Sequence, residues 1–530
     1  MKHRAIVAAA VLTSALVSGG WLMERGSKGS GKDLASRAHL FDEVLQHIRR
    51  DYVDTLPDST LYRHAIDGAL RELRDPHTVF LSPKRLTRLE ESTSGQYAGV
   101  GIQMDVGDSG ITVIGTLPVS PAEAAGILTG DRIISIEGKT TLGVTSEEAL
   151  KSLRGDAGTK VHIIIERPGI DARLPFTLER RKIEVNPVRH ALVLRDSIGY
   201  VDLATFSAAA AADLAHAIDS LRSAGARSLV LDLRGDPGGL LDQGVSVADL
   251  FLNEGQSIVS TRGRGPEETQ SFGDHAAQLW GDMPLIVLTD SSSASASEIV
   301  AGALQDHDRA VIIGTATYGK GSAQRVFKLD DGAVKVTTAL WYTPSGRSIN
   351  RPRRPVTDDD DEDEPPKSDS IPERPKFKTD AGRVVLGGGG IVPDIEIPKR
   401  VITAHDKALQ AALGANVPKF RDVIVQYSLS LRKTRGVTDT NFTVTPAMRA
   451  ELYRQLQTRG VTVPRAVYDS ASPLVTRALT GQLARYVFGQ RVEFSRNLRD
   501  DPSMMRAVEL LTGAKTQKEL LARVPRQLEK

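Results

Sequence analysis

The chain has 530 residues, of which 25% are charged and 40% are apolar, so it is long enough for about three or four globular domains. It contains no cysteine, which excludes disulfide frameworks, cysteine-ligated zinc, iron–sulfur clusters and thiol nucleophiles. The net charge of +2 is unevenly distributed, because residues 401–530 carry 21 Lys/Arg against 11 Asp/Glu. That region has no nucleic-acid-binding motif, so we interpret it as solvated helix surface and expect no nucleic-acid partner.

The first 25 residues have the form of a secretory signal. Lys2, His3 and Arg4 precede an apolar stretch from Ala5 to Met23, and a basic segment followed by an apolar one is typical of exported proteins. The stretch is also long enough to remain as a single anchor, so cleavage and anchoring both stay open. We expect a protein of the bacterial periplasm or cell envelope, with no membrane contact except through residues 1–25.

Residues 33–95 are predicted to form a small helical region. Apolar residues recur there at helical spacing, as in Leu40, Val44 and Ile48. Asp75-Pro76 interrupts the pattern and marks a turn.

Residues 96–182 change to short β-branched strands separated by glycine turns. Thr145 or Ser146, followed by two glutamates, marks the start of a short helix. The predicted elements are strands 101–105, 111–114, 132–137, 161–166 and 174–178, with helices 121–126 and 146–154.

This region resembles a PDZ domain. The resemblance rests on Tyr97-Ala-Gly-Val-Gly-Ile102, then Ser120-Pro-Ala-Glu-Ala-Ala-Gly-Ile127, then Gly130-Asp-Arg-Ile-Ile134. In such a module, free backbone N–H groups of a loop bind a chain-end carboxylate, and the peptide adds as a strand beside the following edge. The residues that would bind peptide here are Ala98, Gly99, Val100, Gly101 and Ile102, and helix 146–153 would form the groove wall.

Residues 183–400 alternate between strands and helices, which predicts an α/β domain. The predicted strands are 198–203, 228–233, 285–289, 310–313, 324–329 and 333–342. The predicted helices are 208–222, 241–251 and one that the segment 290–298 opens and that runs to about Gln305. Within the domain, residues 351–384 are rich in proline and charge and are expected to be a mobile surface insertion. Helical periodicity returns in residues 401–530, whose role the sequence leaves open.

Lys320 ends a segment that fits seven places of a phosphate-binding loop, from Gly314 onward. The eighth place must be Ser or Thr to hold magnesium, and here it is Gly321. The next residues look extended, so no helix N-terminus is expected to receive phosphate. Both observations argue against an NTPase.

The serine cluster between Ser291 and Ser297 offers better chemistry. Ser295 and Glu298 have the spacing of a capping box, so a capped helix without chemistry is one interpretation. A serine at a helix N-terminus can also be a nucleophile, provided that a base removes its proton. No histidine has a suitable context, whereas a lysine with a pKa lowered by roughly three units from 10.4 could serve, at a cost of about 4 kcal/mol. Lys320 would then have to be buried among small apolar groups.

The chain here resembles the carboxy-terminal processing peptidases, also called tail-specific proteases. The resemblance rests on Ser293-Ala-Ser-Ala-Ser-Glu-Ile299, Gln305-Asp306, and Tyr318-Gly-Lys-Gly321 with Gln324. In that family the serine and lysine stand 25 residues apart, and a glutamine follows the lysine by four; Ser295, Lys320 and Gln324 match this register.

The resemblance implies a multidomain α/β protein, with a helical N-terminal region, a PDZ-like domain, a crotonase/Clp-like protease core and a helical C-terminal region. Ser295 would be the nucleophile, Lys320 the general base, and Gln324 the residue that holds the lysine. The backbone amides of Gly238 and Ala296 would form the oxyanion hole. Two points depart from the family pattern: Asp236 stands where the family commonly has Asn, and the acidic insertion after Asn350 interrupts the stretch that leads to Gly388–Asp394.

We therefore expect an exported serine endopeptidase that cuts proteins near accessible C-termini, without metal or cofactor. An activating adaptor and a homo-oligomer are left open. The alternative is a non-catalytic PDZ scaffold with a decayed protease core.

Overall fold

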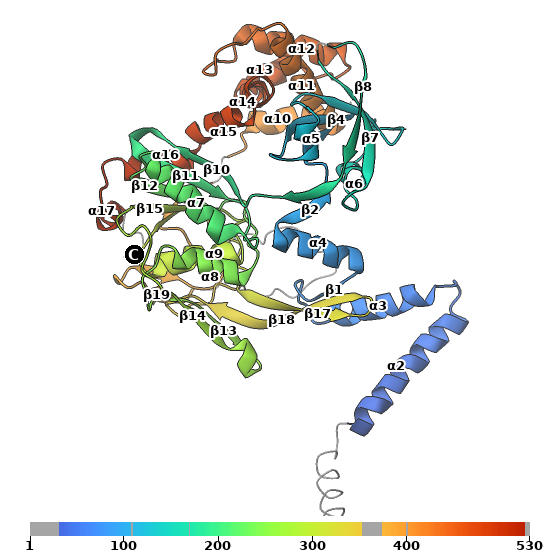
Figure 1. Ribbon diagram of the computed structural model, residues 1–530, viewed down its shortest axis with the longest axis vertical. Coiled ribbons are helices and arrows are strands. Elements are labelled where there is room, and N and C mark those ends of the chain that lie inside the picture. Colours follow the sequence, from blue (N-terminus) through green and yellow to red (C-terminus); the bar gives the residue numbers. More distant parts are fainter. Residues whose placement is uncertain (1–30, 108–109, 169, 352–373, 399–400, 525–530) are drawn as a thin grey trace, which may run out of the picture. The chain divides into compact units, whose positions relative to one another are not determined.

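The computed structural model describes residues 31–107, 110–168, 170–351, 374–398 and 401–524 (Figure 1). It divides into two compact units, one with the residues up to Pro83 and Gln324–Thr337, the other with Lys84–Ala323 and the residues from Thr338 onward. Within the described ranges, no helix combines the length and apolarity that a membrane crossing requires. The expected signal or anchor at residues 1–25 lies outside these ranges, so it stays a prediction.

The first unit contains the predicted N-terminal helices, α2 (Gly31–Asp51) and α3 (Asp58–Arg71), and a short strand, β1 (Val79–Leu81). β1 pairs antiparallel with the first half of β18 (Gly332–Tyr342). The Arg63 guanidinium lies 4.1 Å from the centre of the Phe80 ring, which anchors α3 to this strand. β1 was not predicted, because three residues are too few to show an alternating pattern.

The second unit begins with α4 (Pro83–Ser94) and the PDZ-like domain. Its five predicted strands and two predicted helices are all present, and Thr145 caps the second helix through a reciprocal bond pair with Glu148. The strands run in the order β3-β4-β5-β7-β8, so β3 lies at the edge of the sheet. The elements are β3 (Ile102–Gly107), β4 (Gly110–Thr116), α5 (Pro121–Ala124), β5 (Arg132–Ile136), β6 (Lys139–Thr140), α6 (Ser146–Leu153), β7 (Lys160–Glu166) and β8 (Leu174–Glu179).

The protease-like core is a six-stranded sheet in the order β10-β11-β12-β15-β16-β21. β10 pairs antiparallel with β11, and the other neighbours are parallel. Helices connect the strands from β11 to β16, as expected for parallel neighbours. The strands are β10 (Val188–Val193), β11 (Ile198–Leu203), β12 (Ser228–Asp232), β15 (Leu285–Thr289), β16 (Val311–Gly314) and β21 (Ile395–Glu396). One face packs on α7 (Ala210–Ser223), α8 (Leu241–Asp249) and α9 (Ala296–Asp306).

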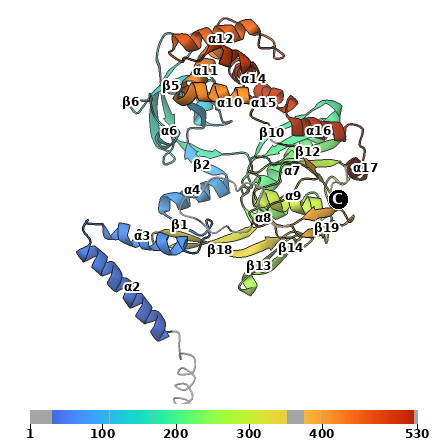
Figure 2. The same cartoon turned by 180° about the vertical axis from the view of Figure 1, so that it is seen from behind.

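The C-terminal helices cover the opposite face of this sheet. Side chains on a strand alternate between the two faces of the sheet. On the face opposite to α7–α9, the side chains of Tyr200, Val230 and Ile286 form a buried cluster with Met504 and Leu510. In Figures 1 and 2, β12 lies between α16 on one side and α8 and α9 on the other. The covering helices are α15 (Gln490–Arg499), α16 (Pro502–Leu511) and α17 (Gln517–Ala522). Part of the C-terminal region thus completes a three-layer domain.

The remaining C-terminal helices form a bundle with its own core, which includes Val423, Leu452 and Leu479. They are α10 (Ala404–Leu413), α11 (Val417–Lys433), α12 (Pro446–Thr458), α13 (Arg465–Ser470) and α14 (Ser472–Leu483). This bundle contacts the PDZ-like domain, where Arg432 donates to the Thr129 carbonyl at 2.8 Å.

Several strands of residues 183–400 were not predicted, among them β10 and β21 of the core sheet. β13 (Ser257–Gly263) and β14 (Gln270–Gly273) form an unpredicted hairpin. β19 (Lys376–Lys378) lies inside the segment expected to be mobile, and it pairs with β20 (Val384–Leu386). The prediction for 351–384 is therefore wrong from residue 374 onward, because backbone pairing stabilises a stretch whose composition is polar. Residues 352–373 lie outside the described ranges.

A buried ion pair ties the end of α9 to the loop after β18. Asp306 and Arg347 are 1% and 0% exposed as side chains and are bonded at 2.7 Å. We expect Asp306→Ala to lower the free energy of unfolding by about 3–5 kcal/mol, because it leaves a buried guanidinium without its counter-charge. The matched control is Asp469→Ala at the exposed Arg465–Asp469 pair, for which a loss below about 1 kcal/mol is expected.

Denaturant unfolding followed by the fluorescence of Trp280 and Trp341, both buried in the core, measures the two losses. Equal losses in the two variants would contradict the assignment of Asp306 as an essential buried partner.

Candidate active site

Ser295 lies between β15 and α9 with φ +55° and ψ −113°. A non-glycine residue in this region is strained, and such strain is common where a side chain must be presented for function. From Ser293 to Asp306, Ser295 is the one residue that is not buried. A single hydroxyl is therefore presented at the end of a buried helix.

The two buried serines beside it are committed to backbone hydrogen bonds. The Ser293 hydroxyl donates to the Leu233 carbonyl at 2.8 Å, and the Ser297 hydroxyl donates to the Asp236 carbonyl at 3.0 Å. Both side chains are fully buried. Their roles are structural, which leaves Ser295 as the serine between Ser293 and Ser297 that a substrate could reach.

Glu298 joins the segments that carry the serine and the lysine. Its Oε2 accepts from the backbone N–H of Ser295 at 2.8 Å and from that of Lys320 at 2.9 Å. Its Oε1 accepts from the Gly319 N–H at 2.7 Å and from the Thr317 hydroxyl at 2.5 Å. Burial raises the pKa of this carboxyl, whereas the four donors favour the carboxylate form.

Sequence reasoning missed this second role of Glu298. Its position three residues after Ser295 predicted a helix cap, and the bond from the Ser295 N–H confirms that part. The bonds to Thr317, Gly319 and Lys320 come from a loop about 20 residues later, which no local pattern indicates. The one signal in the sequence for this role was that Glu298 belongs to the segment Ser293–Ile299, on which the family resemblance rests.

Lys320 is half-buried, so the burial expected for it is observed only in part. Its loop is held against α9 by a second contact, in which the Tyr318 N–H donates to the Ser293 carbonyl at 3.0 Å. β17 (Ser322–Leu329) follows directly, so the expectation that no helix N-terminus follows this lysine is confirmed. The phosphate-loop interpretation is thereby excluded on structural grounds.

The glycine turn after β12 lies against the serine. A Cβ added to Gly238 would be 2.8 Å from the Ser295 Cβ and 2.8 Å from the Ala296 nitrogen, so only glycine fits at this close approach. The Ala294 N–H donates to the Asp236 carbonyl at 3.0 Å, which fixes the turn beside α9. Gly238 and Ala296, the two residues expected to form the oxyanion hole, are therefore adjacent.

Gln324 lies on β17 in the first unit, and its side-chain amide donates to the Thr337 hydroxyl of β18 at 3.3 Å. The bond places the amide on the hairpin of β17 and β18. Its expected role in holding Lys320 stays a prediction.

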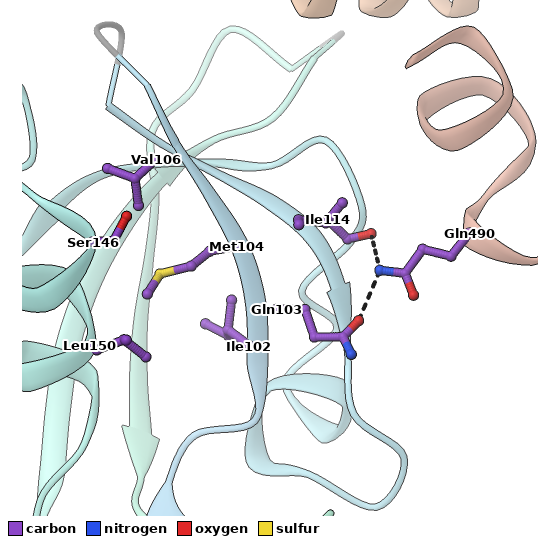
Figure 3. Close-up of a pocket in the computed structure, with 8 residues that line it drawn as sticks. All are labelled: Ile102, Gln103, Met104, Val106, Ile114, Ser146, Leu150 and Gln490. Atoms are coloured by element: carbon purple, nitrogen blue, oxygen red, sulfur yellow. Dashed lines mark hydrogen bonds between the residues drawn. The ribbon is translucent and has the colours of Figure 1, made fainter. Parts of the chain in front are cut away.

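The PDZ-like domain has a groove of about 490 Å³ beside its edge strand (Figure 3). β3 contributes Ile102, Met104 and Val106, and α6 contributes Ser146 and Leu150. This arrangement, an open strand edge facing a helix, can take an extended peptide.

The loop at the end of this groove is shorter than expected. Ala98 and Gly99 belong to β2 (Gln96–Gly99), which pairs with β9 (Arg181–Glu184). The loop proper is Val100 and Gly101, with Gly101 at φ +76°. The predicted set of peptide-binding residues therefore divides into two strand residues, two loop residues and the first residue of β3, because the glycines were read as a turn.

The lining residues of the groove include one that sequence reasoning did not connect with it. Gln490, at the start of α15, donates to the Gln103 side chain at 2.8 Å and to the Ile114 carbonyl at 3.4 Å (Figure 3). It is separated from this strand by almost 400 residues, and no local signal indicates the contact.

Comparisons with known proteins agree with this arrangement. The family model for peptidase family S41 matches residues 197–360, and the PDZ domain model matches residues 87–166. The chain is 42% identical over 314 residues to the carboxy-terminal-processing protease of Bartonella bacilliformis, covering 58% of this chain and 71% of that protein. It is 31% identical over 346 residues to the carboxy-terminal processing protease CtpA of Bacillus subtilis, covering 65% and 73%.

Among solved structures, the chain is similar to a photosystem II D1 C-terminal processing protease, with 28% identity, a TM-score of 0.37, and coverage of 68% of this chain and 87% of that one. The sequence matches to the two curated relatives identify the family. The chain belongs to peptidase family S41, the carboxy-terminal processing proteases, which are serine-type peptidases, and it contains an embedded PDZ domain.

Proposed function

We propose that the chain is an exported serine endopeptidase that uses Ser295 and Lys320 to cut protein substrates near their C-termini. The observation that carries the proposal is the position of Glu298, whose Oε2 binds the backbone of both residues. One carboxylate oxygen thus holds the predicted nucleophile and base in a common frame, as catalysis by positioning requires.

In the proposed reaction, the neutral amine of Lys320 takes the proton of the Ser295 hydroxyl as the oxygen attacks the scissile carbonyl. The Gly238 and Ala296 amides donate to the oxyanion of the tetrahedral intermediate. The protonated lysine gives its proton to the leaving amine, which leaves an acyl-enzyme on Ser295. Water then attacks the acyl group and gives a proton to Lys320, and Lys320 returns that proton to the Ser295 oxygen as the C–O bond breaks and the new C-terminus is released.

The PDZ-like groove provides a site for the substrate's tail. A peptide strand beside Ile102 would pair with the free edge of β3, and apolar side chains would lie between Met104 and Leu150. The partners proposed are therefore proteins or peptides with accessible C-termini. Export follows from the form of residues 1–25, and an adaptor protein and self-association remain open.

A serine-directed fluorophosphonate probe tests the proposal directly. We expect labelling of Ser295, located by peptide mass spectrometry, because only an activated serine reacts at an appreciable rate. Ser292→Ala, which removes an exposed serine of the same cluster, is expected to label normally, whereas Lys320→Met is not. Absence of labelling in a folded protein that binds C-terminal peptides would favour the alternative, a PDZ scaffold without catalysis.

A further inference from the structure

Asp236 is a buried carboxyl group at the oxyanion turn, and the reaction described above does not use it. It is 0% exposed, and its Oδ1 accepts from the Gly238 N–H at 2.7 Å. Gly238 is one of the two proposed oxyanion donors, so in this structure that N–H already has an acceptor. The second oxygen, Oδ2, is buried without a hydrogen-bond partner.

The two protonation states of Asp236 should affect the Gly238 amide differently. A carboxylate accepts a charge-assisted hydrogen bond that is roughly twice as strong as a neutral one, so it competes with the oxyanion for the same N–H. It would also place a second negative charge beside the developing one. The neutral acid, protonated at the partnerless Oδ2, is a weaker acceptor at Oδ1 and carries no charge.

We propose that Asp236 is a positioning residue for the oxyanion hole: its carboxylate sequesters the Gly238 amide, and the neutral acid leaves that amide to the tetrahedral intermediate. The proposal rests on the proposed function, since it assumes an acyl-transfer reaction at Ser295. No bond other than the O–H of the acid forms or breaks in the switch, and the proton is exchanged with water.

The surroundings of Asp236 support a neutral acid near neutral pH. Burial raises the pKa of Asp236 to about 8. The hydrogen bonds from the Gly238 N–H and the Ser297 hydroxyl and the charge of Arg189 lower this pKa, and the charge of Asp202 raises it further. Arg189 and Asp202 belong to β10 and β11 and are bonded to each other at 2.9 Å.

The other charged groups around the turn are paired or hydrogen-bonded. Arg234, in the same turn, binds Asp232 at 2.6 Å and Asp501, the N-cap of α16, at 2.7 Å. Asp290, before α9, accepts from the Gly235 N–H at 3.1 Å. In α9 itself, Glu298 is bound by its four donors. Among these carboxyl groups, Asp236 differs because its Oδ2 is buried and accepts no hydrogen bond.

The pH dependence follows from the sign of this shift. Below about pH 8 the acid is neutral and the amide is available, and above it the carboxylate forms and activity should fall. Asp236→Asn removes the charge at nearly constant shape and should abolish the fall.

The test compares kcat/KM of the full chain and of Asp236→Asn on unfolded casein from pH 6 to 10. The ratio of variant to parent cancels the titration of Lys320, which both proteins share. We expect a ratio that is constant below pH 7 and rises about tenfold per pH unit above pH 8. The ratio should level off near 10²-fold, which is about the loss in kcat expected when one oxyanion donor is removed.

Asp290→Asn is the matched control, because it changes a carboxyl group bound to the same turn, and its ratio is expected to stay constant with pH. If Asp236→Asn does not fold, Asp236→Ser offers a second neutral side chain that can accept from the Gly238 N–H. A ratio that is constant from pH 6 to 10, while Ser295→Ala is inactive, would overturn this inference and leave the proposed function intact. Turnover by Ser295→Ala would instead reject the proposed function.

Discussion

Replacing Ser295 by Ala is expected to reduce kcat/KM on an unfolded protein substrate by about 10⁴-fold or more, because the proposed mechanism has no other nucleophile that could form the acyl-enzyme. Lys320→Met should cost a similar factor, since it keeps the length of the side chain but removes the base. The double variant should be no worse than either single one, because residues that act as a unit lose their joint contribution only once. Proteolysis assays with the three variants measure these factors.

Lys320→Arg separates a base from a positive charge. A guanidinium is always protonated and cannot take the serine proton, so the variant should be as inactive as Lys320→Met. Ser292→Ala should retain full activity, and circular dichroism should show that all variants are folded. Substantial activity in Lys320→Arg would show that charge, not proton transfer, is what this position supplies, and activity in folded Ser295→Ala would refute the serine mechanism.

Glu298→Gln is expected to lower kcat by about 10²-fold. Each carboxylate oxygen accepts from at least one backbone N–H, and a backbone N–H can only donate. In either orientation, the new NH₂ group would face at least one backbone N–H of Ser295, Gly319 or Lys320. Two facing donors repel each other, so the serine and lysine segments would separate. A displacement of about 1 Å at a catalytic group is enough for a loss of this size.

The control is Glu254→Gln, an exposed glutamate of the same domain, for which no change is expected. Fluorophosphonate labelling should slow in Glu298→Gln while the protein stays folded, which distinguishes a positioning role from a purely structural one. Wild-type labelling and turnover in this variant would show that the contact between the two segments does not depend on the carboxylate.

Local sequence patterns predicted most secondary structure in the core and the PDZ-like domain. The apolar runs of β11, β12 and β15 and the capping box of α6 are short-range signals, and the structure contains each of these elements. Strands that are short or polar were missed, such as β1 and β19, because their stability comes from pairing with another strand, the distant β18 for β1 and the nearby β20 for β19.

In the candidate site, too, some residues were identified from the sequence and others only from the structure. The family register singled out Ser295 and Lys320 without any coordinates, and exposure along α9 agrees with the choice of serine. The sequence did not reveal that Gly238 donates to Asp236, nor that Gln490 lines the groove, since both depend on how separate segments pack.

By itself, the order of residues determined which chemical groups are available: one serine at a helix start, one lysine in register with it, and no thiol at all. Only the tertiary structure decided how these groups are held, through a buried glutamate that accepts from two loops and a carboxyl that occupies an amide of the glycine turn. The physical reason is that hydrogen bonding and desolvation act over a few ångströms in space, whatever the separation along the chain.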